Sequence, residues 1–302
     1  MKPWIRFTLI GLAGLLAAGA AAVAYGHWNA DAKQRRVVDV PRRAVPLSHD
    51  PATLERGRYL YLSRGCADCH GAQAGGRLFL DDAKTGLKLA GPNISPGPES
   101  PTAHYSAEDW ERALRHGIKP DGRPLMIMPA QDYARWTDAD VGAVASYLRS
   151  LPPQAGGATI MELPLLVRVA YGLGAIEDAA ARIDHAQSPA QPVPEGITVE
   201  HGRYVAQSCA GCHGAGLSGG RIAGAPLDWP AAANLTPGEG SAMTAYGDAA
   251  AFRQMMRGGK RPDGSAVSPV MPFEALAQMS DTDLDATYLY LKSLPPRKAG
   301  GH

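Results

Sequence analysis

The sequence predicts an all-α chain in which two tandem copies of one helical domain follow an N-terminal membrane helix. Three observations support this prediction. Five short motifs recur in the same order in both halves, apolar residues recur at helical spacing in each half, and an uncharged segment of 20 residues begins at Phe7. No convincing alternating strand pattern appears. The 302 residues suffice for two ordinary domains with linkers.

The N-terminal segment has the length of a membrane span. Lys2 and Arg6 precede the uncharged stretch, which ends at Gly26. A cleaved signal peptide usually has an apolar region of roughly 7–15 residues, whereas roughly 17–25 are needed to span a bilayer. Residues 1–30 are therefore predicted to be a signal-anchor or transmembrane helix, and the length favours a retained helix. The small residues Ala22-Val23-Ala24 keep cleavage open as the alternative.

A basic linker, residues 31–50, follows the apolar segment. Its basic residues outnumber those before the segment: Lys33, Arg35, Arg36, Arg42 and Arg43. Taken alone, the positive-inside rule would place this linker and everything after it on the cytoplasmic side.

An internal repeat organises the rest of the chain. Cys66 aligns with Cys209 and Met128 with Met271 at an offset of 143 positions, and residues 147–153 align with 290–296 at the same offset. Two further pairs of matching motifs lie between them: Asn93-Ile94-Ser95-Pro96 with Asn234-Leu235-Thr236-Pro237, and Pro120-Asp121-Gly122 with Pro262-Asp263-Gly264. Small insertions and deletions explain their offsets of 141 and 142. The chain is therefore read as a duplicated domain.

Each copy is expected to contain three main helices. The predicted ranges are Leu54–Leu62, Ala107–His116 and a helix after the cap Thr137 in the first copy, and Glu200–Gln207, Ala249–Arg257 and a helix after the cap Ser280 in the second. The middle helices end at glycine and the last helices at a double proline.

All four cysteines lie in two copies of C-x-x-C-H, Cys66-Ala67-Asp68-Cys69-His70 and Cys209-Ala210-Gly211-Cys212-His213. This motif is the attachment site of a c-type haem, in which the two thiols add to the haem and the histidine reaches the iron. The alternatives are a zinc site, which needs a second ligand pair, and a redox motif, which needs a βαβ context. Neither context is visible, so two covalently bound haem c groups are predicted.

The arrangement resembles class I cytochrome c. The resemblance rests on Gly-Arg-Tyr before each haem motif, on C-x-x-C-H, on a downstream Met-Pro and on the terminal Tyr-Leu helix. It covers residues 51–153 and 195–296, which we predict as cytochrome c domains 1 and 2. The fold class is accordingly two tandem class I cytochrome c domains with an N-terminal membrane helix. Gly57 and Gly202 are candidate points of close approach for the crossing helices, and a glycine that ends a turn is an equal alternative.

His70 and His213 are the predicted first iron ligands, and each iron has one further axial position. Met271 precedes Pro272 in a loop, where a methionine has little packing reason to be. In the first domain the repeat aligns Met128, and not Met126, with Met271. A methionine ligand raises the haem potential and suits electron transfer. Two histidines, His104 and His116, are rivals whose aligned partners are not histidine, and both are expected at the surface or near a propionate.

Other repeated positions support weaker expectations. Asn93 and Asn234 are predicted either to bind a propionate or the ligand loop, or simply to cap their loops. Arg77 and Arg221 are predicted either to neutralise a propionate or to be solvated. In the cytochrome family a proline carbonyl often holds the haem-ligating histidine, which suggests Pro92 in domain 1. Ala233 replaces it in domain 2, so that contact is left open.

The interdomain linker, residues 154–194, contains the apolar piece Leu163–Leu173, and residues 297–302 form a tail. The apolar piece is too short to span a bilayer. Packing against the domains is expected first, with contact to a membrane or partner subunit as alternatives. This piece and the repeated loops resemble the cytochrome c subunits of bacterial membrane-bound dehydrogenases for alcohols, gluconate and related substrates. Those subunits usually carry three haem domains, whereas two are predicted here.

The predicted function is that of an electron carrier with no catalytic residues of its own. The resemblance implies haem attachment on the outer side of a bacterial inner membrane, so the haem domains are expected in the periplasm despite the basic linker. The expected partners are the inner membrane and dehydrogenase subunits, with oxidase subunits or a soluble cytochrome as alternatives. A near-neutral charge of +1 gives no sign of a nucleic-acid partner. Two other functions stay open, a subunit of a terminal oxidase and, less favoured, a di-haem peroxidase.

Overall fold

The computed structural model describes residues 2–222, 224–226 and 228–300. Residue 1 of the predicted membrane helix and residues 301–302 of the predicted tail lie outside the described residues. The helices and strands, in chain order, are α1 (Pro3–Arg35), α2 (Pro51–Ser63), α3 (Cys66–His70), β1 (Arg77–Asp82), β2 (Leu87–Gly91), α4 (Ala107–His116), η1 (Ala130–Asp132), α5 (Asp138–Ser150), β3 (Ile160–Glu162), α6 (Leu165–Leu173), α7 (Ala179–Arg182), α8 (Val199–Val205), η2 (Ala206–Cys209), α9 (Ala210–His213), η3 (Ala242–Ala245), α10 (Ala249–Gly258), α11 (Phe273–Leu276) and α12 (Asp281–Ser293).

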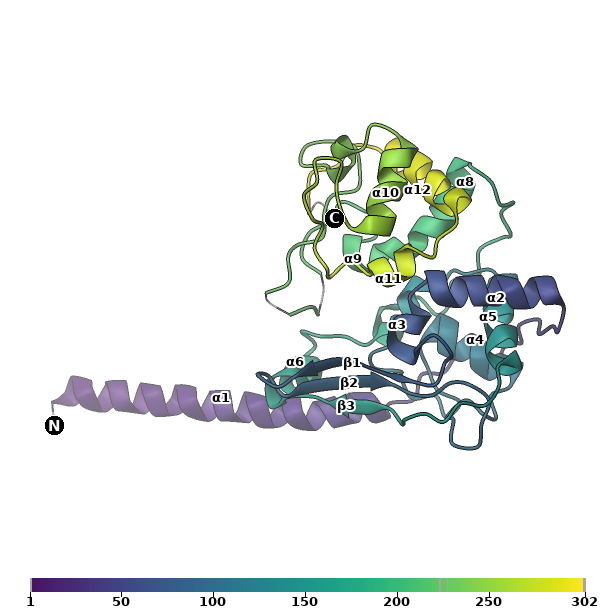
Figure 1. The fold of residues 1–302 in the computed structure, drawn as a ribbon. Coiled ribbons are helices and arrows are strands. Elements are labelled where there is room, and N and C mark those ends of the chain that lie inside the picture. Colours follow the sequence, from purple (N-terminus) through teal and green to yellow (C-terminus); the bar gives the residue numbers. More distant parts are fainter. Residues whose placement is uncertain (1, 223, 227, 301–302) are drawn as a thin grey trace.

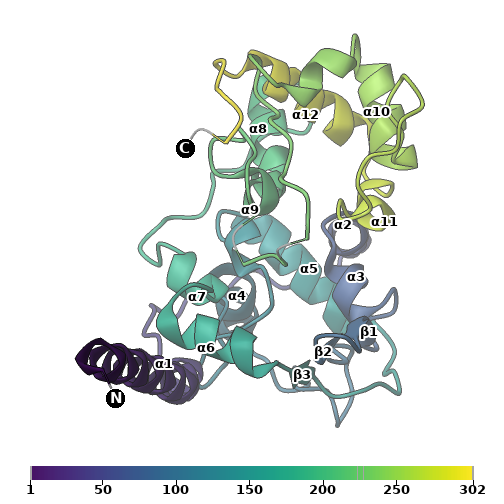
Figure 2. The same cartoon turned by 90° about the vertical axis from the view of Figure 1, so that its left-hand side faces the viewer.

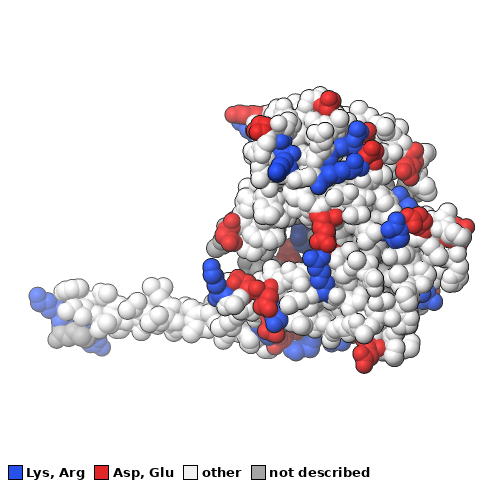
Figure 3. All heavy atoms as spheres, in the orientation of Figure 1, with Lys and Arg blue, Asp and Glu red and all other residues white. Residues whose placement is uncertain are grey.

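The two halves of the chain fold as two helical bodies, and α1 projects from the first of them (Figure 1). Within the described residues, α1 is the helix that is long and apolar enough to cross a membrane. It extends to Arg35, so the first residues of the predicted basic linker belong to this helix. The shaft of α1 is uncharged between its first residues and the body of the molecule (Figure 3).

Each body is built around a crossing of its first and last long helices. α2 crosses α5 in the first body, and α8 crosses α12 in the second. A Cβ atom on Gly57 would lie 2.0 Å from the carbonyl oxygen of Ala143, and one on Gly202 would lie 1.9 Å from that of Ala286. Contacts this short leave no room for a side chain, so the two glycines are points of close approach and not turn residues.

Hydroxyl and carboxylate caps begin the long helices where the sequence predicts them. The Thr137 hydroxyl accepts from the amide of Asp140, and the Ser280 hydroxyl accepts from that of Asp283. These bonds satisfy amides that a helix N-terminus leaves without a partner. α4 has the predicted bounds, and α10 runs one residue further than predicted. The helix predicted over Glu200–Gln207 is instead a short α-helix followed by a 3₁₀ turn.

A small antiparallel sheet departs from the expectation of helices and loops alone. Its strand order is β1-β2-β3, and Leu89 of β2 pairs with Met161 of β3. Buried and exposed residues do not alternate in β2, which ends in three consecutive buried residues. The third strand comes from the interdomain linker and has only three residues. β1 and β2 form a local hairpin whose burial does not alternate, and only β3 comes from a distant segment, so a periodicity search has little signal to find here.

The interdomain linker packs back onto the N-terminal helix. Its apolar piece forms α6, which contacts α1 (Figure 2). A Cβ atom on Gly172 would lie 1.7 Å from the carbonyl oxygen of Gly26, so the two backbones touch at this crossing. The sequence predicted packing against the haem domains; the piece packs instead against α1.

Candidate functional site

The two C-x-x-C-H motifs lie on matching short helices. Cys66–His70 forms α3, and Cys209 ends the 3₁₀ turn that leads into α9. All four thiols are free and none forms a disulfide. Burial raises the pKa of the Cys66 thiol to about 12 and the pKa values of Cys69 and Cys209 to about 11. Reactive redox cysteines have lowered pKa values, so this environment disfavours the redox alternative.

Each motif histidine is held by a backbone carbonyl. Nδ1 of His70 lies 2.9 Å from the oxygen of Pro92, and Nδ1 of His213 lies 2.8 Å from that of Ala233. Burial lowers the pKa of both rings, which favours the neutral form. Because a carbonyl only accepts, Nδ1 carries the proton and Nε2 keeps a free lone pair, the state that a metal-ligating imidazole requires.

The replacement of Pro92 by Ala233 therefore leaves this contact intact. The accepting atom is a backbone oxygen, which alanine supplies as well as proline does. The asymmetry that the sequence suggested at this position disappears in the structure.

The two Met-Pro loops also match in geometry. The amide of Ala130 donates to the oxygen of Met128, and the amide of Phe273 donates to that of Met271, both at 2.8 Å. Pro129 and Pro272 then precede η1 and α11. Both methionines are partly buried.

Each methionine packs against the core of its own body. The core against which Met128 packs also contacts the partly buried Cys66, and the core beneath Met271 contacts Cys209. In the described part of the chain, Met126 is not among the side chains that pack against the first core. Met255, Met256 and Met279 are buried core residues, as their positions on or beside helices predicted.

The protein atoms around each motif fit a c-type haem better than a zinc ion. Across the described residues, no group of three or more His, Cys, Asp and Glu side chains gathers to hold a metal. Each motif instead offers two free thiols, one imidazole with an available Nε2 and one thioether in the same packed region. Two thiols and two axial donors per site are the set that haem c uses.

A comparison with known families agrees with this donor set. The sequence profile of cytochrome c matches residues 54–152 and 199–295, one segment in each body. The chain belongs to the cytochrome c family. It contains two cytochrome c domains and carries two covalently bound haem c groups as an electron carrier.

Several curated proteins are similar to this cytochrome. The fructose dehydrogenase cytochrome subunit of Gluconobacter japonicus is 28% identical over 288 residues, which are 86% of this chain and 56% of that protein. The cytochrome c subunit of the quinone alcohol dehydrogenase of Gluconobacter oxydans is 29% identical, over 82% of this chain and 55% of its own length. A di-haem cytochrome c of Cereibacter sphaeroides is 31% identical over 49% of each chain. This chain thus spans little more than half of the dehydrogenase subunits that it matches.

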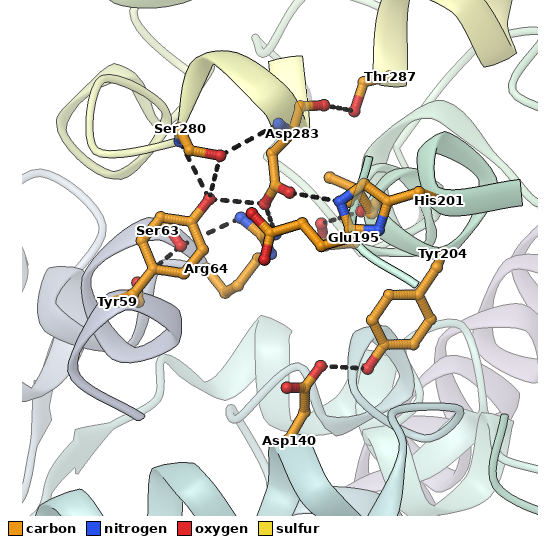
Figure 4. Close-up of polar contacts among 12 residues, drawn as sticks. Tyr59, Ser63, Arg64, Asp140, Glu195, His201, Tyr204, Ser280, Asp283 and Thr287 are labelled. Carbon is orange, nitrogen blue, oxygen red and sulfur yellow. Dashed lines mark hydrogen bonds and ion pairs between the residues drawn. The ribbon is translucent and has the colours of Figure 1, made fainter. Parts of the chain in front are cut away.

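A reciprocal pair of tyrosines joins the two cytochrome domains (Figure 4). Tyr59 of domain 1 donates to Asp283 of domain 2 at 2.6 Å, and its hydroxyl accepts from the amide of Ser280 at 3.0 Å. Tyr204 of domain 2 donates to Asp140 of domain 1 at 2.6 Å and accepts from the amide of Thr137 at 3.1 Å. Each tyrosine thus binds the start of the other domain's last helix. The four residues Tyr59, Tyr204, Asp140 and Asp283 are called the tyrosine clamp below.

The tyrosine clamp was missed by the sequence reasoning, although its signal is present there. In the sequence, the Gly-Arg-Tyr motif indicated only the resemblance to class I cytochrome c. Its tyrosine recurs in both copies, as does the aspartate of each last helix, so a repeated donor and a repeated acceptor were both available. Nothing local to either motif indicates that they pair across domains.

The two halves of the tyrosine clamp differ in charge. Asp140 forms a 2.8 Å ion pair with Arg56 of its own domain. In domain 2 the residue aligned with Arg56 is His201, whose Nε2 lies 2.7 Å from Asp283. Asp283 also forms an ion pair with the buried Arg64 of domain 1, across the interface. Burial alone would raise the pKa of Asp283, but the Arg64 charge and its hydrogen bonds outweigh burial and hold the pKa below its usual value. Asp283 is therefore a buried carboxylate that links both domains.

The Met-Pro loop of each domain lies against the haem motif of the other. α11, which follows Met271, contacts α3, and η1, which follows Met128, contacts α9. A Cβ atom on Gly211 would lie 2.5 Å from Oδ1 of Asp132, and burial raises the pKa of Asp132 to about 7. On the other side Glu274 pairs with Arg77 at 3.3 Å. The two haem motifs therefore border one shared interface.

The remaining weaker expectations have mixed outcomes. The side-chain oxygen of Asn93 accepts from the amide of Ser95, and that of Asn234 accepts from the amide of Thr236, both at 2.9 Å, which is loop capping. Arg77 pairs across the interface, whereas Arg221 lines a hollow beside Cys212.

The expectation for one of the two rival histidines is wrong. His104 is exposed as expected, but His116 is buried and its Nδ1 lies 2.9 Å from that of His185. α4 turns this ring inward against the interdomain linker.

Proposed function

We propose that the protein is a membrane-anchored, periplasm-facing di-haem cytochrome c that relays single electrons, as the electron-transfer subunit of a respiratory dehydrogenase complex. The observation that carries the proposal is the shared interface, where the Met-Pro loop of each domain lies on the haem motif of the other. Electron transfer between two haem sites needs the haem edges close together and fixed in orientation. The similarity to dehydrogenase cytochrome subunits supports the choice of partner.

His70 with Met128 and His213 with Met271 are the proposed axial pairs. Cys66, Cys69, Cys209 and Cys212 are the proposed attachment residues. The neutral imidazoles held at Nδ1 and the placement of both methionines against the cores support this assignment. One-electron exchange is the chemistry that the haem iron supplies when it is bound. A thioether that fills the sixth position keeps substrates from the iron and limits each site to electron transfer.

The anchor and its orientation are supported by the charges around the end of α1. The positive-inside rule counts basic residues near a span, and the basic linker argued against a periplasmic position. Arg36 forms a 2.5 Å ion pair with the buried Asp178, and Arg43 pairs with Asp138. Arg168 pairs with Asp31 of α1 at 2.6 Å. Arg36 is thus paired with a buried carboxylate, whereas Arg43 pairs at the surface, so two of these basic residues present less free charge than the sequence suggests.

The axial assignment is tested by substituting each methionine separately. Met128→Ala and Met271→Ala should each remove one of two Met–iron charge-transfer bands from the oxidised spectrum and lower one of two haem potentials. Met126→Ala is the matched control and should leave both bands and potentials unchanged. Loss of a band in Met126→Ala, with none in Met128→Ala, would overturn the assignment in domain 1.

The electron partner is tested by purification from membranes in mild detergent. A dehydrogenase subunit should co-purify with the cytochrome and reduce both haems when its substrate is added. Co-purification with a copper–haem core instead would assign the protein to a terminal oxidase. Fast reaction of one haem with peroxide, together with an absent Met–iron band, would make it a peroxidase.

A further inference from the structure

Within the described residues, the interdomain helix α6 leaves large apolar side chains mostly exposed. Leu165, Leu166 and Leu173 are 56%, 79% and 52% exposed, and on the neighbouring part of α1 Tyr25 and Trp28 are 55% and 63% exposed. Single exposed leucines are ordinary, but a cluster of large apolar side chains on two contacting helices marks an interaction surface. We call these five residues the apolar collar.

The apolar collar lies at one particular height along α1. The crossing point is Gly26 with Gly172, and Gly26 is also the last residue of the uncharged stretch that begins at Phe7. Twenty helical residues rise about 30 Å, which matches a hydrocarbon core of roughly 30 Å. The crossing therefore falls where a span ends and the headgroup region begins.

The direction of α6 fits this position. In Figure 1 α1 runs across the picture, and in Figure 2 it is seen end-on while α6 extends across it. A helix that runs across a membrane-spanning helix lies roughly in the plane of the bilayer. Tyrosine and tryptophan are enriched at that level, because their rings are apolar and their polar atoms reach water.

Polar bonds join α6 to α1 around the glycine crossing. The side-chain amide of Asn29 donates to the oxygen of Gly172 at 2.7 Å, and Nζ of Lys33 donates to that of Tyr171 at 3.0 Å. Arg168 binds Asp31, and Arg36 binds Asp178 beyond the helix end. These bonds hold the two helices as one unit, so the apolar collar keeps a fixed height relative to α1.

We propose that the apolar collar inserts into the headgroup–acyl boundary of the phospholipid bilayer, on the side where the cytochrome domains lie. The proposal rests on the anchoring of α1 proposed above. Its surface is continuous with the apolar shaft of α1, which is why a bilayer, and not a protein subunit, is the occupant. The short helix thereby sets the distance and tilt of domain 1 relative to the membrane.

The proposal is tested with single spin labels in the full-length haem-loaded protein in phospholipid nanodiscs. The native cysteines are consumed by haem, so Leu166→Cys supplies one labelling site. Leu15→Cys reports the shaft of α1, and Leu289→Cys on α12 is the exposed control in domain 2. At position 166, collision with dissolved oxygen relative to a water-soluble nickel complex should be several-fold higher than at position 289.

The three positions separate the possible failures. Lipid-like access at position 15 with water-like access at 166 would overturn the apolar collar and leave the anchor standing. Low access to both reagents at 166 would mean that protein covers the surface, which also overturns it. Water-like access at position 15 would show that the anchoring itself is wrong.

Discussion

In the tyrosine clamp, each tyrosine hydroxyl both donates one hydrogen bond and accepts another. The Tyr59 hydroxyl donates to a carboxylate and accepts from the amide of the cap residue before α12, and Tyr204 does the same before α5. A helix N-terminus leaves its first amides without partners, and side chains of the same domain usually satisfy them. Here part of that task falls to the neighbouring domain, so helix capping and domain docking share the same atoms.

Removing one hydroxyl should weaken docking without disturbing either core. We expect Tyr59→Phe to lower the free energy of unfolding by about 1–3 kcal/mol, because the buried Asp283 and a helix amide each lose a partner. Chemical denaturation followed by visible absorption measures this. Tyr147→Phe changes a half-buried tyrosine whose hydroxyl lies outside the clamp. This variant should lower the free energy of unfolding by less than Tyr59→Phe does. Equal losses in the two variants would contradict a special role for Tyr59.

The Asp283 carboxylate gives the clamp a pH dependence. The folded-state pKa lies below the ordinary value of 3.8, so the stabilisation is fully present above about that pH. It is lost as the pH falls through the folded-state value, when the carboxylate takes up a proton. Denaturation midpoints measured between neutral pH and strong acid should therefore hold steady and then fall.

The variant Asp283→Asn isolates this contribution. It should be less stable than the wild type near neutral pH, because Arg64 loses its ionic partner in a buried site. The difference in the free energy of unfolding between the two proteins should narrow in strong acid, where the wild-type carboxylate is protonated and also uncharged. A difference that stays constant with pH would mean that Asp283 does not titrate in the window given above.

At the scale of elements, two helices far apart in sequence meet backbone to backbone at a pair of glycines. Gly26 and Gly172 let α1 and α6 approach backbone to backbone. Gly172→Ala should separate them, because its methyl group would meet the Gly26 carbonyl. We expect a loss of about 1–3 kcal/mol, as for other overpacked sites, together with faster proteolysis between α6 and α7.

The matched control for that change is Gly19→Ala on the bare part of α1. A Cβ atom there meets nothing within 4 Å, so the variant should behave like the wild type. Unchanged proteolysis in Gly172→Ala would show that α6 is not held at this crossing.

Elements with a strong local pattern were predictable and elements made by distant pairing were not. The capped helices after Thr137 and Ser280 begin where predicted, because capping and periodicity are properties of a short window. The sheet was absent from the prediction because burial does not alternate in the hairpin strands β1 and β2, and because β3 has three residues and pairs with a strand some 70 positions earlier. The histidine contact at Ala233 was uncertain for a different reason. The acceptor is a backbone oxygen, and the identity of the side chain does not predict where that oxygen lies.

At the scale of the whole molecule, the relative placement of the domains was beyond the sequence. Tyr59 and Asp283 are 224 positions apart, and no pattern in one motif points to the other. The duplication predicted two similar bodies but gave no contact between them. The residues proposed to hold the two haems, in contrast, lie within repeated motifs.

The shared interface should make the two domains unfold together. We expect one cooperative transition in the wild type by both haem absorption and tryptophan fluorescence, because exposing either domain breaks the tyrosine clamp. The double variant Tyr59→Phe/Tyr204→Phe should show two separable transitions. Two transitions already in the wild type would mean that the clamp contributes little to the coupling.

The mutual covering of the haem motifs also constrains how the protein is made. α3 lies against α11 and α9 lies against η1, so the closed molecule partly hides the helices on which the cysteines must react. An attachment enzyme needs those helices accessible. We therefore expect haem insertion to precede the closing of the two halves, with the second motif, at Cys209, receiving its haem before the domains dock.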